Sequence, residues 1–92
     1  MSIQWLYDVI ESRRQNPSDK SYTSSLFAEG LPKIAQKVGE EGTEVVVAAL
    51  AQNDQRLIEE VADLTYHTLV LLAARGLHIE QVLAELEKRH RR

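Results

Sequence analysis

Two long segments with helical periodicity, joined by a short polar turn, dominate this sequence. Residues 31–75 read LPKIAQKVGEEGTEVVVAALAQNDQRLIEEVADLTYHTLVLLAAR. Apolar residues recur every three or four positions on both sides of Asn53-Asp54, which is the spacing of one face of an α-helix. Pro32 suits the first turn of a helix, where its missing N–H needs no partner. The sequence therefore predicts one helix from about Leu31 to Ala51 and a second from Gln55 to Arg75.

Shorter helices are predicted on both sides of this pair. Apolar residues at helical spacing predict a helix from Ser2 to about Arg14, which the turn-forming residues Asn16–Asp19 follow. A polar segment, Lys20–Ser25, leads into a short helical piece around Leu26–Glu29, and a last helix runs from about Ile79 to His90. Because no stretch shows the pattern of a strand, we expect the chain to be all-α.

Length and composition exclude several classes of protein. A chain of 92 residues is expected to form one small domain, residues 1–92, whose core is marginal unless a second subunit extends it. The net charge of −3 argues against nucleic acid as the main partner, and the lack of cysteine excludes disulfides and thiolate chemistry. The longest apolar stretch, Leu69–Ala74, is too short to span a bilayer, and the N-terminus lacks the pattern of a signal peptide. We therefore expect a soluble, cytoplasmic protein without a membrane partner.

Two clusters of carboxylates lie inside the two long predicted helices. They are Glu40-Glu41-x-x-Glu44 and Glu60-x-x-Asp63. Like charges three or four positions apart cost roughly 0.2–0.5 kcal/mol per pair on an exposed helix. No lysine or arginine is interleaved within either cluster, so a bound cation would remove this cost. Ligands that are all oxygen suit a hard ion, which predicts Mg²⁺, or Mn²⁺, before Zn²⁺.

Helical periodicity places these acids beside the apolar stripe of each helix rather than squarely opposite it. The short Asn53-Asp54 turn would lay the two helices antiparallel and bring the two clusters together around one or two ions. The alternative is that both clusters are ordinary solvated surface. Lys37 falls on the same face as the first cluster, where it is either a salt-bridge partner or a contact for a phosphate group.

Other polar residues are weaker candidates for a site. Lys20 and the hydroxyl groups of Ser21, Tyr22 and Thr23 can hold a phosphate, although most hydroxyl-rich loops hold only water. His67 is more typical of a hydrogen-bonded core residue than of a metal ligand. The second long helix is apolar over most of its circumference, which is typical of a helix that is buried centrally or in a subunit interface. In so short a chain this pattern favours a dimer.

Several segments together resemble one enzyme family. They are Ser21–Phe27 (SYTSSLF), Lys37–Glu44 (KVGEEGTE) and Glu60–His67 (EVADLTYH). This combination closely resembles the phosphoribosyl-ATP pyrophosphohydrolases of histidine biosynthesis. These belong to the MazG-like all-α NTP pyrophosphohydrolases, which share an E-E-x-x-E … E-x-x-D pattern. The resemblance covers nearly the whole chain and implies a MazG-like helical bundle completed by homodimerisation.

The resemblance also implies an activity and roles for the acids. The activity is Mg²⁺-dependent hydrolysis of the α–β phosphoanhydride of phosphoribosyl-ATP, which yields phosphoribosyl-AMP and pyrophosphate in the second step of histidine biosynthesis. Lys37 becomes a candidate contact for the polyphosphate. The implied metal ligands are Glu41, Glu44, Glu60 and Asp63, with Glu40 as a further ligand or as the base that orients water.

Two other functions stay open at the level of the sequence. The acidic pattern alone would also suit a MazG-like housekeeping hydrolase of non-standard or deoxynucleoside triphosphates. Outside the enzymes, the alternative is a non-catalytic helical dimerisation module whose acids are solvated surface. Because the chain begins at Met1 directly in its first helix, we expect a free-standing domain rather than one fused to the cyclohydrolase of the next step.

Overall fold

The computed structural model describes residues 1–91, so Arg92, the last residue of the predicted domain, lies outside the described part. Within residues 1–91 the chain forms five helices and no strand, which confirms the prediction of an all-α chain. The helices are α1 (Ile3–Gln15), α2 (Tyr22–Glu29), α3 (Leu31–Ala51), α4 (Asp54–Ala74) and α5 (Ile79–His90). None of these helices combines the length and the apolar character that crossing a membrane requires.

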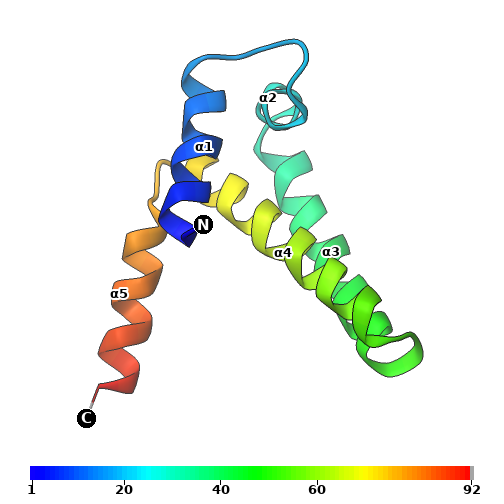
Figure 1. The fold of residues 1–92 in the computed structure, drawn as a ribbon. Helices are drawn as coiled ribbons and strands as arrows, with labels where there is room; N and C mark the ends of the chain where they lie inside the picture. Colours follow the sequence, from blue (N-terminus) through cyan, green and yellow to red (C-terminus); the bar gives the residue numbers. More distant parts are fainter. Residues whose placement is uncertain (92) are drawn as a thin grey trace.

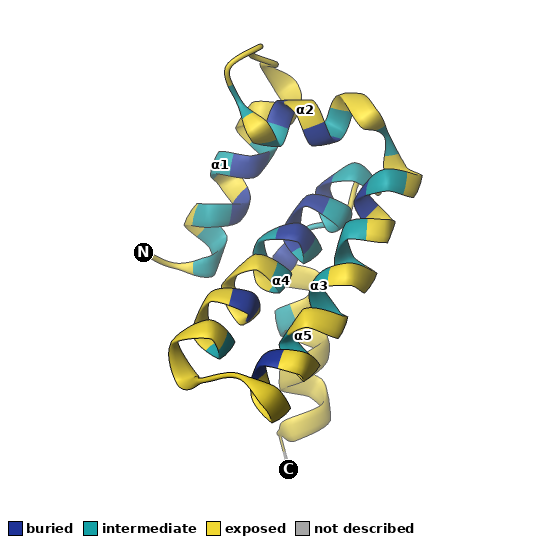
Figure 2. Cartoon of the chain, turned by 90° about the vertical axis from the view of Figure 1, so that its right-hand side faces the viewer, coloured by how far each residue is buried: buried dark blue, intermediate teal, exposed yellow. Residues whose placement is uncertain are grey.

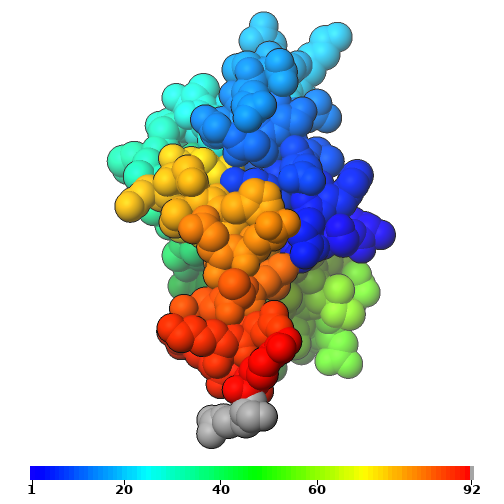
Figure 3. Space-filling view, turned by 90° about the vertical axis from the view of Figure 1, so that its left-hand side faces the viewer, coloured from blue at the N-terminus to red at the C-terminus, as the bar shows by residue number. Residues whose placement is uncertain are grey.

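The two longest helices, α3 and α4, form an antiparallel hairpin (Figure 1). Asn53 sets its turn, because the Asn53 side chain accepts a hydrogen bond from the Arg56 N–H at 2.9 Å and so caps α4. α1 and α2 lie at the end of the hairpin that is remote from this turn (Figure 1). α5 begins at the same end and runs away from α1 (Figure 1), so that in Figure 3 its residues, coloured orange to red, lie below those of α1. The predicted turn therefore does produce the predicted hairpin.

The hydrophobic core lies where α1, α2 and the first residue of α5 meet the hairpin. Its largest fully buried side chains are Ile10, Leu26, Ile34, Leu69 and Val70. Figure 2 shows buried residues gathered at this end, whereas most residues near the turn are exposed. A hydrogen bond from the Tyr7 hydroxyl to the Leu77 carbonyl, 2.6 Å long, joins α1 to the segment before α5. The core therefore anchors one end of the hairpin and leaves the other end projecting.

The predicted helix bounds are wrong at one place. α2 begins at Tyr22 and not near Leu26, because the Ser21 Oγ caps it by accepting a hydrogen bond from the Ser24 N–H at 3.1 Å. Most of the segment predicted as a polar lead-in is therefore helical. Elsewhere the bounds agree with prediction within one residue, since Ser2 and Asn53 are N-caps that precede α1 and α4.

The projecting end of the hairpin leaves large apolar side chains uncovered. Leu50 is 84% exposed, Ile58 63% and Val61 43%. By contrast, Leu69 and Val70 further along α4 are fully buried. The apolar circumference predicted for α4 is thus covered at only one end by residues 1–91.

Candidate functional site

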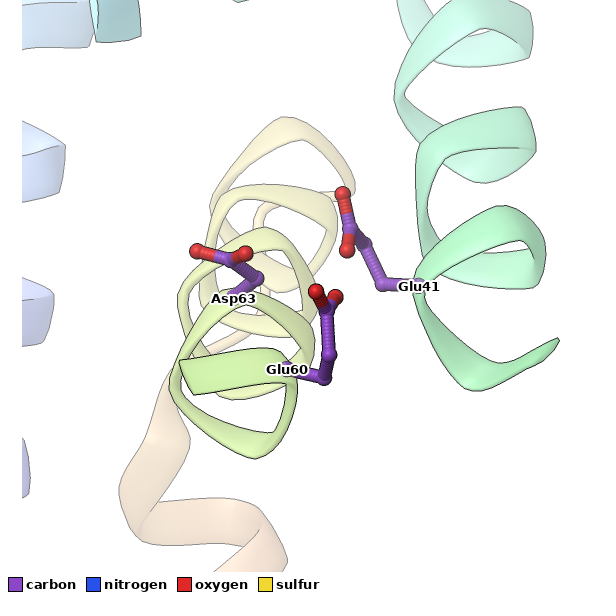
Figure 4. Close-up of side chains that lie close together, drawn as sticks. All are labelled: Glu41, Glu60 and Asp63. Atoms are coloured by element: carbon purple, nitrogen blue, oxygen red, sulfur yellow. The ribbon is translucent and has the colours of Figure 1, made fainter. Parts of the chain in front are cut away.

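Three carboxylates from the two long helices meet in the middle of the hairpin. Glu41 comes from α3, and Glu60 and Asp63 come from α4. One oxygen from each carboxylate lies within 4.8 Å of the oxygens of the other two. Figure 4 shows Glu41 on one helix and the other two acids on the facing helix. The antiparallel packing therefore brings together two acidic clusters that are far apart in the sequence.

Two oxygens of this site are buried without a hydrogen-bond partner. Glu60 is only 4% exposed, and Glu41 is half-buried between the helices. The Oε2 atoms of Glu41 and Glu60 have no partner among the described residues. An unpaired buried carboxylate oxygen is costly, and the cost is relieved when a cation binds it or when the group takes up a proton. Asp63 is exposed, so the site is open to solvent on one side.

A fourth acid, Glu44, belongs to the same electrostatic unit. The close approach of the Glu44 carboxyl raises the pKa of Glu60 from 4.5 to about 7, and burial and the negative charge of Glu44 act in the same direction. Burial also raises the pKa of Glu41, with the charges of Glu44 and Asp63 adding to the effect. Burial and the neighbouring carboxylates therefore raise the pKa of both Glu41 and Glu60 above the usual value for a glutamate.

Arg56 is a component of the site that the sequence analysis did not find. Its guanidinium donates to Glu60 Oε1 at 2.7 Å and to Glu59 Oε1 at 2.6 Å. It thereby supplies a positive charge beside Glu60, which opposes the rise in the pKa of that group. The i, i+4 spacing of Arg56 and Glu60 was the signal that could have revealed this ion pair. Arg56 also lines a cavity of about 230 Å³ together with Glu44 and Glu60.

His67 is buried against the carboxylates and is hydrogen-bonded at both ring nitrogens. Its Nδ1 lies 2.8 Å from the backbone carbonyl of Asp63, and its Nε2 lies 3.3 Å from the Tyr22 hydroxyl. The same Nδ1 is 3.9 Å from Glu41 Oε1. The prediction of a hydrogen-bonded core histidine is confirmed. The sequence did not reveal that this histidine connects the acidic site to α2.

Of the predicted phosphate contacts, Tyr22 is linked to the carboxylates through His67, and the other hydroxyl groups have local partners. The Ser21 hydroxyl caps α2, the Thr23 hydroxyl is hydrogen-bonded to that of Tyr66, and the Tyr22 hydroxyl is bonded to His67. Within the described part of the chain, no hydrogen bond or ion pair joins the side chains of Glu40, Lys37 or Lys20 to the four carboxylates. Lys37 also forms no salt bridge within residues 1–91, contrary to one of the two interpretations of this residue.

Comparison with known proteins gives a consistent result over nearly the whole chain. Residues 3–90 match the family model described as phosphoribosyl-ATP pyrophosphohydrolase. A phosphoribosyl-ATP pyrophosphatase of Erythrobacter litoralis is 53% identical over 88 residues, which cover 96% of this chain and 85% of that protein. The enzyme of the same name from Lacticaseibacillus casei is 54% identical over 96% of this chain and 80% of its own length. The enzyme of the same name from Pyrobaculum calidifontis is 49% identical over 95% of this chain and 93% of its own length.

Proposed function

The chain belongs to the phosphoribosyl-ATP pyrophosphohydrolase family, and from that premise we propose that it hydrolyses the α–β phosphoanhydride bond of phosphoribosyl-ATP. The products are phosphoribosyl-AMP and pyrophosphate, and the reaction is the second step of histidine biosynthesis. The observation that carries this proposal is the cluster of Glu41, Glu60 and Asp63, in which two buried oxygens lack a partner among residues 1–91. Such a site suits a substrate that brings a divalent cation with its phosphates.

The residues present fit a divalent metal ion. Every donor in the cluster is a carboxylate oxygen, and the donors come from two rigid helices, which favours Mg²⁺ or Mn²⁺ over softer ions. Bound Mg²⁺ would neutralise negative charge on the substrate phosphates and on the departing pyrophosphate. The residues proposed to hold it are Glu41, Glu44, Glu60 and Asp63.

The protein's own acids and bases would supply the remaining functions. We assign Glu40, which is exposed on α3 next to Glu41, to orient the attacking water or to act as a further ligand. The oxygen of that water forms a bond to the α-phosphorus, and a carboxylate takes its proton. The bond from the α-phosphorus to the α–β bridging oxygen breaks, and its electron pair leaves with pyrophosphate.

Cations around the acidic cluster are proposed to contact the polyphosphate. Lys37 lies half-buried on α3, one turn before Glu41, and has no ion-pair partner within residues 1–91. Lys20 lines a shallow pocket of about 240 Å³ with Arg13, Ser18 and Ser21 at the start of α2. The candidate phosphate contacts are the side chains of Lys37 and Lys20 and the hydroxyl groups of Ser21 and Thr23.

The site of bond cleavage provides the direct test of this function. Hydrolysis of phosphoribosyl-ATP in ¹⁸O-labelled water should place the label in phosphoribosyl-AMP and none in pyrophosphate, because water attacks the α-phosphorus. Mass spectrometry of the two products measures this. Orthophosphate as the first product, or label in pyrophosphate, would refute the proposal. Higher kcat/KM with deoxynucleoside triphosphates than with phosphoribosyl-ATP would assign the chain instead to a housekeeping nucleotide hydrolase.

We also propose that two copies of the chain pair through the projecting end of the hairpin. Leu50, Ile58 and Val61 are exposed there, and exposed apolar patches of this kind are a mark of interfaces. Sedimentation equilibrium should therefore give twice the chain mass of 10.4 kDa at micromolar concentration. Ile58→Lys should yield a folded monomer. Ile58 is exposed in the single chain, so a lysine there leaves the core unchanged, whereas burying its charge in an interface between two chains is costly.

The matched control for this pairing is Leu86→Lys on α5. Leu86 is also exposed, at 48%, but lies outside the hairpin, so this variant should remain dimeric. A wild-type protein that is monomeric at micromolar concentration, or a dimer lost only in the Leu86 variant, would contradict pairing through α3 and α4.

A further inference from the structure

Tyr22 presents a large aromatic ring at the surface near the carboxylates. It is the first residue of α2 and is 54% exposed. Its hydroxyl is nevertheless fixed, since it lies 3.3 Å from His67 Nε2. A tyrosine side chain has only two main torsions: the hydrogen bond at its far end fixes where the ring lies, and the stacked Tyr66 ring beside it restricts the orientation of the ring plane. The exposed surface is thus a positioned ring rather than a mobile one.

The histidine that holds this ring is itself fixed. His67 is buried, and its Nδ1 is 2.8 Å from the backbone carbonyl of Asp63. Because a carbonyl oxygen only accepts hydrogen bonds, Nδ1 carries a proton and donates to it, and Nε2 forms the hydrogen bond with the Tyr22 hydroxyl. The Tyr66 ring supports Tyr22 from one side, with ring centroids 6.3 Å apart and planes 25° from parallel. One side of the Tyr22 ring therefore has a fixed aromatic neighbour, while much of the ring remains exposed.

The ring lies close to the acidic site. Only the imidazole of His67 stands between the Tyr22 hydroxyl and Glu41, since its Nδ1 is 3.9 Å from Glu41 Oε1 and its Nε2 meets the hydroxyl. In a nucleotide, one ribose separates the α-phosphate from the base. A nucleotide whose α-phosphate lies at the carboxylates would therefore have its base within reach of Tyr22.

From this arrangement we infer that the Tyr22 ring is the surface on which the purine base of the substrate stacks, and that His67 is the positioning residue that holds it there. The inference rests on the proposed function and adds the means of base recognition. Bases stack favourably on aromatic side chains whatever their hydrogen-bonding edge, so a substituted purine is accepted as readily as a plain one. The Tyr22 hydroxyl, engaged with His67, is not assigned to a phosphate.

Two substitutions at Tyr22 separate the ring from its hydroxyl. Tyr22→Leu removes the aromatic face and should raise the KM for phosphoribosyl-ATP, and the Kd for AMP measured by calorimetry, by about 10- to 100-fold. Tyr22→Phe keeps the face and should show a much smaller rise in both constants. The Kd for pyrophosphate with Mg²⁺ should be unchanged in both variants, because pyrophosphate has no base. Thermal unfolding and sedimentation of each variant should match those of the wild type.

Each alternative role of Tyr22 predicts a different result. Equal weakening of AMP and pyrophosphate binding in the Leu and Phe variants would overturn the inference in favour of a phosphate contact through the hydroxyl. A Leu variant that becomes monomeric would overturn it in favour of a subunit contact. If the wild-type enzyme hydrolyses phosphoribosyl-ATP and the Leu variant has the same KM as the wild type, the stacking inference is wrong while the proposed function stands. If AMP binding depends on the ring but phosphoribosyl-ATP is not hydrolysed, only the proposed function fails.

Discussion

Removal of divalent metal ions with EDTA should abolish pyrophosphate release from phosphoribosyl-ATP, and Mg²⁺ or Mn²⁺ added in excess should restore it. The expected loss is complete because Glu41, Glu44, Glu60 and Asp63 would otherwise face a negatively charged polyphosphate. Arg56 is the sole basic side chain of residues 1–91 within salt-bridge distance of Glu60, and one guanidinium cannot balance this charge. A continuous assay for pyrophosphate measures the effect.

Binding of the ion can also be followed without substrate. Calorimetric titration of Mg²⁺ into the chelated protein should give a saturable signal that weakens as the pH falls below about 7, since protons then compete for Glu60. Zn²⁺ or Ca²⁺ at matched concentration provides a comparison of ion type. Full turnover after exhaustive chelation, or no detectable Mg²⁺ binding at pH 8, would contradict the assignment of the acids as metal ligands.

Glu60→Gln and Asp63→Asn should each lower kcat by roughly a hundredfold or more, because loss of a ligand removes several kcal/mol of charge stabilisation from the transition state. Neither change alters the size of the side chain, so both variants should fold. The matched control is Glu59→Gln, which removes the exposed neighbour that contacts the same Arg56. This control should keep wild-type turnover. A Glu60 or Asp63 variant with near-wild-type kcat at saturating Mg²⁺ would exclude that residue from the site.

The Glu60 variant should also change how stability depends on pH. The pKa of Glu60 is about 7 in the folded chain and is expected near its ordinary value of 4.5 in the unfolded chain. Between these values the folded state holds a proton that the unfolded state releases, so the stability of the metal-free wild type falls as the pH rises from 4.5 to 7. Glutamine never ionises, so Glu60→Gln should be more thermostable than wild type at pH 8, with a smaller difference at pH 5.

Differential scanning calorimetry of both proteins, with EDTA present, tests this directly. Adding Mg²⁺ should raise the melting temperature of the wild type at pH 8 and should raise that of the variant much less, because ligand binding stabilises only the chain that can bind it. The Glu59→Gln control should follow the wild type in both conditions. A Glu60 variant less stable than wild type at pH 8 without metal would mean that the Arg56 ion pair outweighs the repulsion between the acids.

Local signals in the sequence determined the helices and the placement of the acids along them. Pro32 and the Asn53-Asp54 turn mark the ends of the long helices, and capping and backbone geometry act within a few residues. The same periodicity placed both acidic clusters beside apolar faces, and a turn that short allowed only an antiparallel hairpin. The one error in the helices, the start of α2, arose because a serine such as Ser21 serves equally well in a loop and as an N-cap.

Tertiary packing alone decided the environment of each acid and the connections between distant segments. Glu60 is buried and Asp63 is exposed although they lie one turn apart on the same helix, because α3 covers only part of that surface. The link from Tyr22 through His67 to the acidic site joins residues 45 positions apart in the chain. Periodicity tells which face of a helix a residue occupies, but not which neighbour covers that face. Which neighbour covers a face depends on how the five helices of residues 1–91 fill a shared core. That packing determined which carboxylates, Glu41 and Glu60, have a raised pKa.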